Sequence, residues 1–404
     1  MKIIAINLGC FGSTGTIMSQ IAHLSRECGI DYYCVYPDSS LNKNRFESDF
    51  ITQKKRWWLI ETKISHLLGL NDLLSFLPTK RVIRFLKKEK PDIVHLHNIH
   101  NCFLNYPLLF SFLSKKDIHV VWTLHDCWSF TGRCPYFSIT KCEQWKSNCS
   151  KCIYNKRYYP KSFIRTEKLQ LKLKKHYFSL LNHMTIVTPS KWLSDLVKQS
   201  FLCKYPTRVI YNGIDFSVFK PQQSDCKRKY KINNNRFVLL GVAFDWGYRK
   251  GLDVFVKLSK VLDDKFYQIV IVGTNSTIDK SLPSNIVSIH QTESKIELAQ
   301  LYSTADLFIN PTREDNLPTV NIESLACGTP VLSFRTGGSP EIIDKTCGSI
   351  VDCDDFESLK NEIIRICKTK PYSKDNCLKR AKVFDMNVRF QDYICLYEEL
   401  NKKQ

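Results

Sequence analysis

The amino-acid sequence predicts an α/β fold made of two doubly wound domains with parallel sheets. Short continuous apolar runs alternate with helix-like segments, which is typical of parallel sheets covered on both faces. The second half of the chain repeats the pattern of the first half. The length of 404 residues also suits two or three domains.

Each half contributes its own series of strands and helices. In the first half, strands are expected at Lys2–Asn7, Asp31–Tyr36, Ile93–His97, Val120–Leu124 and Met184–Thr188. The helices expected between them are Thr16–Glu27, Lys80–Lys88 and Lys191–Gln199. In the second half, strands are expected at Arg236–Val242, Gln268–Val272, Leu307–Asn310 and Pro330–Ser333. The helices expected there are Leu252–Leu262, Lys295–Ser303 and Thr319–Cys327.

The domain boundary is expected near Cys203–Thr207, where polar residues and a proline precede an apolar run. The domains would then span residues 1–206 and 207–384. The amphipathic segment Val388–Leu400 predicts a final helix, and residues 385–404 are expected to pack back on the first domain.

Composition limits the class of protein. Apolar residues make up 43% of the chain, yet no stretch reaches the roughly 20 apolar residues that a membrane span needs. The N-terminal apolar run turns Gly/Ser/Thr-rich and predicts a β-strand in place of a signal peptide, so we expect a cytoplasmic protein. Its 17 cysteines then do not imply disulfides. The cysteines expected to be small buried core residues include Cys28, Cys34, Cys327 and Cys395.

The net charge of +20 is concentrated in the first half of the chain. Residues 1–205 carry 31 Lys and Arg against 14 Asp and Glu, whereas residues 206–404 carry 28 against 25. Nucleic acid, an anionic membrane surface or a simple solubility bias would each account for the excess. Because Lys54–Trp58 places basic residues and tryptophans before the apolar-rich Leu59–Leu70, a peripheral position on the inner face of the cell membrane is favoured. No RNA- or DNA-binding module is evident, so nucleic acid is not an expected partner.

A glycine-rich turn follows the first strand. The sequence Gly9-Cys-Phe-Gly-Ser-Thr-Gly15 leads into a helix, and the N–H groups of such a turn can bind phosphate. The candidate phosphate-binding residues are Gly12, Ser13, Thr14 and Gly15. A tight strand-to-helix turn without a ligand is the alternative interpretation.

The stretch from Asn310 to Val331 carries the most specific pattern. It reads Asn310-Pro-Thr-Arg-Glu-Asp-Asn-Leu-Pro-Thr-Val-Asn-Ile-Glu-Ser-Leu-Ala-Cys-Gly-Thr-Pro-Val331 and predicts a strand, an acidic loop and a helix that Gly328 ends. A carboxylate one to two turns into this helix, Glu323, can accept hydrogen bonds from sugar hydroxyls. An acidic helix start that complements the helix dipole is the alternative interpretation.

This pattern resembles the donor-site signature of glycosyltransferase family 4, which has the GT-B fold of two Rossmann-like domains facing a cleft. The family carries an acidic residue, seven intervening residues, a Glu and an Ala-x-Gly-x-Pro-Val type ending. The pair here is Asp315 and Glu323; the family usually has Glu in the first place, and Glu314 can share that role. The resemblance implies that Glu323 binds the ribose hydroxyls of a nucleotide sugar. It also implies that Asp315 and the amides around Asn316 and Leu317 face the donor sugar and phosphates.

The segment from Gly241 to Gly251 supports the resemblance. A Lys between a strand and a helix can neutralise a diphosphate leaving group, and the family has a Lys-Gly pair that matches Lys250 and Gly251. The family commonly has an Arg five residues before this Lys, where the present chain has Asp245; Arg249 can compensate. The Trp and the Arg-Lys-Gly ending look like a subgroup associated with surface polysaccharide synthesis of the capsular or colanic-acid type.

Histidines end two strands of the first half. A His at a strand end is more often structural than catalytic, but the resemblance makes His125 a candidate for contact with the donor sugar or the reacting oxygens. His97 is a weaker candidate, and His95 is expected to face the other side of its strand. The loop Thr336–Glu341 matches the family's Gly-Gly-x-Pro-Glu loop, which borders the donor phosphates.

Four cysteines lie close together after His125. Cys134, Cys142, Cys149 and Cys152 could hold a structural zinc ion, pack as reduced thiols or form disulfides. The final C-x-x-C spacing fits zinc, whereas the first spacing of seven intervening residues is unusual.

The resemblance implies a retaining glycosyltransferase with a nucleotide-sugar donor, UDP- or GDP-linked, and a lipid-linked saccharide acceptor. Its generally described route is a same-face displacement in which the leaving phosphate helps to deprotonate the acceptor. No D-x-D metal site is evident near the donor region, so we expect catalysis without a cofactor or metal ion. Asp352-Cys-Asp354 has the letters of a D-x-D metal motif but precedes a helix, so we expect an N-cap there. The alternatives are a nucleotide-sugar epimerase on the same fold, a phosphorylase, and a basic protein that binds nucleic acid or membranes.

Overall fold

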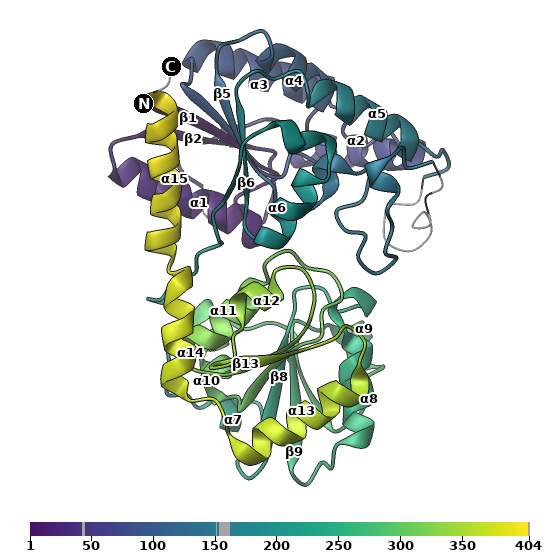
Figure 1. Ribbon diagram of the computed structural model, residues 1–404, viewed down its shortest axis with the longest axis vertical. Coiled ribbons are helices and arrows are strands. Elements are labelled where there is room, and N and C mark those ends of the chain that lie inside the picture. Colours follow the sequence, from purple (N-terminus) through teal and green to yellow (C-terminus); the bar gives the residue numbers. More distant parts are fainter. Residues whose placement is uncertain (43–44, 151, 153–161, 403–404) are drawn as a thin grey trace. The chain divides into compact units, whose positions relative to one another are not determined.

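The computed structural model describes residues 1–42, 45–150, 152 and 162–402 (Figure 1). The chain divides into two compact units, the first of Met1–Tyr211 with Arg389–Gln404 and the second of Asn212–Val388. No helix in the described ranges combines the length and the apolar character that crossing a membrane requires.

The first unit is built on a parallel sheet with the strand order β3-β2-β1-β4-β5-β6-β7. The strands are β1 Lys2–Ile6, β2 Asp31–Tyr36, β3 Phe50–Ile51, β4 Ile93–Leu96, β5 His119–Thr123, β6 Met184–Thr188 and β7 Thr207–Val209. The helices are α1 Gly12–Glu27, α2 Lys55–Leu68, α3 Phe76–Glu89, α4 Tyr106–Leu113, α5 Glu167–Tyr177 and α6 Lys191–Lys198. Figure 1 shows α3 and α4 on one face of this sheet and α1 on the other. Both faces are thus covered, which explains why the central strands are continuously apolar.

The second unit has a parallel sheet with the order β10-β9-β8-β11-β12-β13. Its strands are β8 Phe237–Val242, β9 Tyr267–Val272, β10 Ile286–Ile289, β11 Leu307–Asn310, β12 Val331–Phe334 and β13 Gly348–Val351. Its helices are α7 Cys226–Lys229, α8 Leu252–Val261, α9 Ser276–Asp279, α10 Lys295–Thr304, α11 Thr319–Ala326, α12 Ser339–Ile342, α13 Phe356–Thr369 and α14 Lys374–Ala381. Helices α8 and α13 share one core with the strands, through Phe255, Leu359 and Ile363.

The last helix, α15, spans Met386–Asn401 and belongs to the first unit from Arg389 onward. Its buried Tyr393 lies 3.2 Å from the Thr123 hydroxyl, and the Tyr397 hydroxyl lies 2.7 Å from Nδ1 of His95. At the exposed end of the contact, Arg208 of β7 pairs with Glu399. The final helix therefore completes the covering of the first sheet.

The predicted fold class is confirmed, and every predicted strand and helix is present with ends shifted by a few residues. The elements that we did not predict include β3, α4, β10 and β13, as well as the short helices α7, α9 and α12. The first unit extends to Tyr211, past the expected boundary, because β7 pairs with β6 and so adds to the first sheet.

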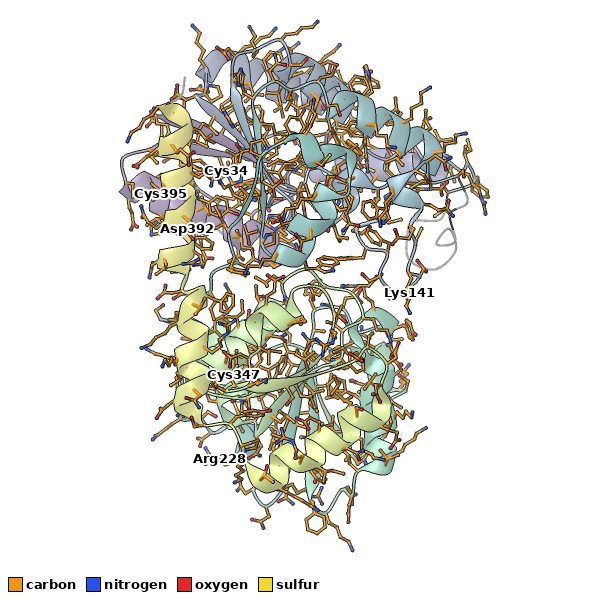
Figure 2. The ribbon with its side chains drawn as sticks, in the orientation of Figure 1. Cys34, Lys141, Arg228, Cys347, Asp392 and Cys395 are labelled. Carbon is orange, nitrogen blue, oxygen red and sulfur yellow. The ribbon has the colours of Figure 1, made fainter. Side chains whose placement is uncertain are left out.

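The expected burial of cysteines is right for two of four positions. Cys34 and Cys327 are buried, whereas Cys28 and Cys395 are exposed. Figure 2 labels Cys34 in the first unit and Cys395 on α15. Cys28 is the residue that caps the C-terminus of α1, and Cys395 lies on the outward side of α15. A small apolar side chain at a helix end or on an outward helix face stays in water whatever its sequence context.

Candidate active site

The candidate donor residues meet at the carboxyl edge of the second sheet. Strands β8 and β11 are neighbours, and the strand order reverses between them, which is where open α/β sheets bind ligands. The loop after β8 carries Arg249 and Lys250, and the loop after β11 carries Glu314 and Asp315. Lys250 Nζ lies 2.5 Å from Asp315 Oδ2, and Arg249 donates to the backbone oxygen of Glu314 at 3.1 Å. Residues far apart in sequence thus form one charged site.

Arg313 joins these two loops, and we did not predict it. Its side chain is 5% exposed and bonds at 2.8 Å to Asp253 at the start of α8 and to Asp354 before α13. Its backbone N–H donates to the Arg249 carbonyl at 2.8 Å. The two carboxylates raise the pKa of Arg313 against the opposing effect of burial. The only feature of the sequence that pointed to Arg313 was its position inside the acidic loop.

The expectation that Asp352-Cys-Asp354 forms a helix cap is wrong by one residue. The N-cap of α13 is Asp355, whose side chain accepts from the N–H of Ser358. Asp354 instead pairs with Arg313, and Asp352 pairs with Arg335. The cap lies later because the backbone of Asp354 is left-handed, with φ 67°, and the helix begins only after it.

The glycine loop after β12 packs tightly against the acidic loop. Gly337 has φ 53°, and a Cβ there would lie 1.9 Å from the carbonyl oxygen of Asp315. Gly338 donates its N–H to the Asn316 carbonyl at 2.6 Å. The Asn316 N–H, expected to face the donor, bonds to its neighbour Asp315 at 2.9 Å, and the Asn316 and Leu317 side chains are buried. Only glycine permits this close approach.

Glu323 lies one turn into α11 and remains half-buried. Its Oε2 accepts a hydrogen bond from the buried Tyr302 hydroxyl at 3.1 Å. Burial raises the pKa of Glu323, although the hydrogen bonds from Tyr302 and Thr319 act against that shift. Tyr302, on α10, was not predicted as a site residue because a tyrosine inside an amphipathic helix is usually core.

The carboxyl ends of β4 and β5 in the first unit carry a cluster of histidines. Nδ1 of His97 lies 3.1 Å from Nε2 of His125, and Nε2 of His97 is buried without a hydrogen-bond partner. Burial lowers the pKa of His125 to about 4 and that of His95 to about 3, so both rings are neutral near pH 7. His125 retains 8% exposure, which leaves it the most accessible of the three rings.

The expectation for His95 is wrong. Its ring centroid lies 4.0 Å from that of His97, so the two side chains share one face of β4. Residues two apart in a strand point the same way, because the side-chain period of a strand is two. His95 is held by Thr123 and Tyr397, so its surroundings are those of a packed core residue.

The glycine-rich turn after β1 starts α1 at Gly12, whose φ is 67°. A Cβ on Gly15 would lie 2.6 Å from the backbone of Cys10, so the turn is too tight for a side chain there. No side chain caps the N-terminus of α1, and Ser13 and Thr14 lie in its first turn. The geometry suits an anion but also suits a simple tight turn, so the phosphate role of these residues stays a prediction.

The four clustered cysteines line a small cavity of about 20 Å³, together with Trp145 and Phe137. Burial and a hydrogen bond with Cys152 raise the pKa of the Cys134 thiol. None of the four forms a disulfide in the described part of the chain. Across residues 1–42, 45–150, 152 and 162–402, no three or more His, Cys, Asp or Glu side chains are grouped so that they could hold a metal ion. The zinc interpretation therefore stays a prediction without support from these residues.

Comparison with known proteins identifies the family. A family model described as Glycosyltransferase Family 4 matches residues 15–218, and one described as glycosyl transferases group 1 matches residues 234–369. The chain is 28% identical over 326 residues to a putative colanic acid biosynthesis glycosyl transferase of Escherichia coli, which covers 77% of each chain. It is 25% identical over 257 residues to an O-antigen chain mannosyltransferase of Salmonella typhimurium, which covers 61% of this chain and 64% of that one.

The fold has close solved counterparts. The structure of Anabaena HepE in complex with UDP superposes with a TM-score of 0.69 at 14% identity, covering 99% of this chain and 100% of that chain. The two parallel Rossmann-like sheets and this likeness confirm the GT-B fold class. With both halves matched by its models, the chain belongs to glycosyltransferase family 4.

Proposed function

We propose that this protein is a retaining, metal-independent glycosyltransferase that builds a surface polysaccharide. It would transfer a hexose-type sugar from a UDP- or GDP-sugar to a lipid-linked saccharide at the inner face of the cell membrane. The observation that carries the proposal is the meeting of Lys250 and Asp315 at the switch point of the second sheet, with Glu323 following on α11. The colanic-acid and O-antigen relatives support the pathway, and the UDP complex of HepE supports the donor class.

The second unit supplies the donor-binding groups in this proposal. The Glu323 carboxylate accepts hydrogen bonds from the ribose hydroxyls, and Tyr302 fixes its orientation. The Lys250 ammonium and the Arg249 guanidinium neutralise the charge that develops on the leaving diphosphate. Asp315 holds Lys250 in place and faces the donor sugar.

The chemical step follows the same-face route in this proposal. The bond from the anomeric carbon to the diphosphate oxygen breaks, and the acceptor hydroxyl attacks from the same face as the leaving group. Its proton passes to the departing phosphate oxygen, so no carboxylate nucleophile on the opposite face is needed. His125, neutral because it is buried, donates or accepts a hydrogen bond at a sugar hydroxyl.

The membrane association rests on α2. Trp57, Ile60, Ile64 and Leu67 recur at helical spacing and are 40–63% exposed. Phe163, 88% exposed, lies beside the end of this face, because its N–H donates to the Leu67 carbonyl at 3.1 Å. Exposed lysines and an arginine flank the same helix: Lys54, Lys55, Arg56 and Lys63.

An apolar helix face with basic residues beside it is the composition of a helix that lies in an anionic membrane surface. The family assignment also favours sugar transfer over the epimerase and nucleic-acid alternatives. In this proposal α2 keeps the protein where a lipid-linked acceptor is present.

Isothermal titration of the purified protein with UDP, GDP and ADP, each with and without EDTA, tests the donor site. We expect one uridine or guanosine diphosphate to bind tightly and EDTA to leave its affinity unchanged. Failure of all three nucleotides to bind would contradict the proposal. Loss of binding in EDTA would overturn only its metal independence.

A further inference from the structure

The second sheet ends in β13, and the outer edge of this strand borders a groove of about 760 Å³. The four residues of β13 all line the groove. Ile343 and Lys345, which follow α12, line one side of it, and Asn361 and Arg365 of α13 line the other. None of the candidate donor-binding residues lines this groove. It is therefore a feature of the sheet edge and separate from the candidate active site.

The backbone groups of β13 point alternately to the sheet and to the groove. The Val351 carbonyl accepts from the Arg335 N–H at 2.7 Å, so it faces β12. The Cys347 carbonyl accepts from the Val331 N–H at 3.2 Å and faces the same way. Alternate residues of a strand direct their N–H and C=O groups to opposite sides. The N–H and C=O of Ile350 therefore face the groove, where a further strand can pair with them.

This edge lacks the usual protection against pairing. Edge strands are commonly blocked by a charged residue, a proline or a covering element. β7, an edge strand of the first sheet, carries Arg208, which pairs with Glu399 of α15. β13 reads Gly348-Ser-Ile-Val351, without a charged residue or a proline, and all but its first residue keep partial exposure. An unprotected edge beside a groove is typical of a surface that pairs with another strand.

A second copy of β13 fits this edge in the antiparallel direction. With Ile350 on the two-fold axis, the N–H of each Ile350 donates to the Ile350 carbonyl of the other copy, as in a hydrogen-bonded antiparallel pair. The same register sets Ser349 opposite Val351 and Gly348 opposite Asp352, so no like charges face each other. The two Ile350 residues lie opposite each other, and β-branched pairs of this kind stabilise a sheet.

The charges at the two ends of β13 also fit a second copy. The exposed Lys345 precedes the strand, and Asp352, 76% exposed, follows it. Asp352 pairs with Arg335 at 2.8 Å, but so exposed an ion pair contributes little and leaves the carboxylate accessible. Antiparallel pairing sets the start of one strand beside the end of the other, so Lys345 of each copy comes to the same end as Asp352 of the other. The edge is thus complementary to itself, which a closed two-fold interface requires.

We propose that two copies of this chain associate through their second units, by antiparallel pairing of β13 about Ile350 into one continuous sheet. Because the strand has only four residues, the association is weak and reversible, as expected for a small interface. The inference needs neither the nucleotide site nor the membrane contact, so it does not rest on the proposed function.

Sedimentation equilibrium of the purified chain, from about 5 to about 300 µM, tests the association in the range expected for a small interface. We expect the average mass of the wild type to rise from that of one chain toward that of two. Ile350→Lys places an ammonium group of each copy beside the axis and should weaken the association about tenfold or more. Val287→Lys is the matched control, because Val287 is also half-buried but lies in β10, at the opposite edge of the same sheet. It should associate as the wild type does.

Two further variants separate strand pairing from other contacts. Ile350→Pro removes an N–H that faces the groove and leaves the bonds to β12 in place, so the edge strand should tolerate it. Both hydrogen bonds on the axis are lost, and the association should weaken about tenfold. Trp57→Ser with Leu67→Ser removes apolar side chains from α2 and should leave the association unchanged. Circular dichroism checks the fold of each variant, and if one of the Ile350 variants does not fold, the other decides.

A chain that stays monomeric over the whole concentration range would overturn the proposal. An association that the Ile350 variants leave unchanged, that Val287→Lys weakens as much, or that the α2 variant abolishes would assign the contact to another surface and overturn it too. None of these measurements uses a nucleotide. Failure of the association therefore leaves the proposed function untouched, and failure of UDP to bind leaves the association untouched.

Discussion

The two units share one architecture but have opposite electrostatics at their carboxyl edges. In the second unit, the edge holds charged side chains, with the partly exposed Lys250 against Asp315 and the buried Arg313 between two carboxylates. In the first unit, the corresponding edge holds the buried His97 and His125, and burial lowers the pKa of both rings.

If the proposed function holds, this difference explains how one fold serves two ligands. Parallel sheets bring their loops to the carboxyl edge whatever the sequence, so the fold supplies the place and the side chains supply the selectivity. In the proposed function, the partly exposed Lys250 turns from Asp315 to the diphosphate, whereas the neutral ring of His125 forms a hydrogen bond with a sugar hydroxyl. On that proposal, the second unit binds the nucleotide and the first contributes to binding the sugar.

The strongest test of this division is Glu323→Ala. We expect UDP binding to weaken by about 3 kcal/mol, roughly a hundredfold, because two charged hydrogen bonds to ribose are lost. Calorimetry measures the affinity, with circular dichroism as the check on folding. The exposed Glu357→Ala, on α13, is the matched control and should bind UDP as the wild type does.

His125→Ala, in the first unit, should also keep UDP affinity within about twofold. A large loss of UDP affinity in this variant would contradict the proposed division of roles between the two units.

A second test concerns the membrane contact proposed for α2 of the first unit. Trp57→Ser with Leu67→Ser should weaken binding to phosphatidylglycerol vesicles by about 2 kcal/mol, roughly thirtyfold, because two apolar side chains are removed. Sedimentation with the vesicles measures the bound fraction. The control is Phe266→Ser, since Phe266 is 58% exposed on the second unit. Equal losses in the two variants would reject α2 as the contact.

Lys250→Met tests whether Lys250 of the second unit contacts the diphosphate of the nucleotide. A contact with the diphosphate predicts that UDP binds about tenfold more weakly, whereas uridine, which lacks the phosphates, binds unchanged. Lys260→Met, on the exposed side of α8, provides the comparison. If uridine affinity falls as much as UDP affinity, Lys250 acts on the fold of the site and not on the phosphates.

The smallest effect expected is a pH dependence of nucleoside binding. Only the ionised Glu323 accepts two hydrogen bonds, and burial raises its pKa above the usual 4.5. Uridine binding should therefore weaken as the pH falls, and the loss should begin at a higher pH than the titration of an ordinary glutamate would produce. Uridine avoids the titration of phosphate. Glu323→Gln should show a flat profile; the same slope in that variant would assign the dependence to another group.

Local sequence patterns determined the fold class and predicted the candidate donor residues. Continuous apolar runs require sheets that are covered on both sides, and the acidic loop, α11 and Gly328 occupy one stretch of chain. Asp315, Glu323 and Lys250 were identifiable because the motif that carries each of them is contiguous. A motif that occupies one short stretch of sequence can be recognised without knowing which residues contact each other across the fold.

Only the tertiary structure revealed the residues that act across the fold. Arg313 joins three loops, Tyr302 reaches Glu323 from another helix, and α15 contacts His95 from the far end of the chain. A polar cavity in the first unit, whose lining includes Asp72, Asn101 and Gln170, likewise combines segments that share no local pattern. Which residues become partners depends on which loops the sheet brings to one edge. Strand order and long-range packing decide this, and the periodicity of apolar residues along the chain does not encode either of them.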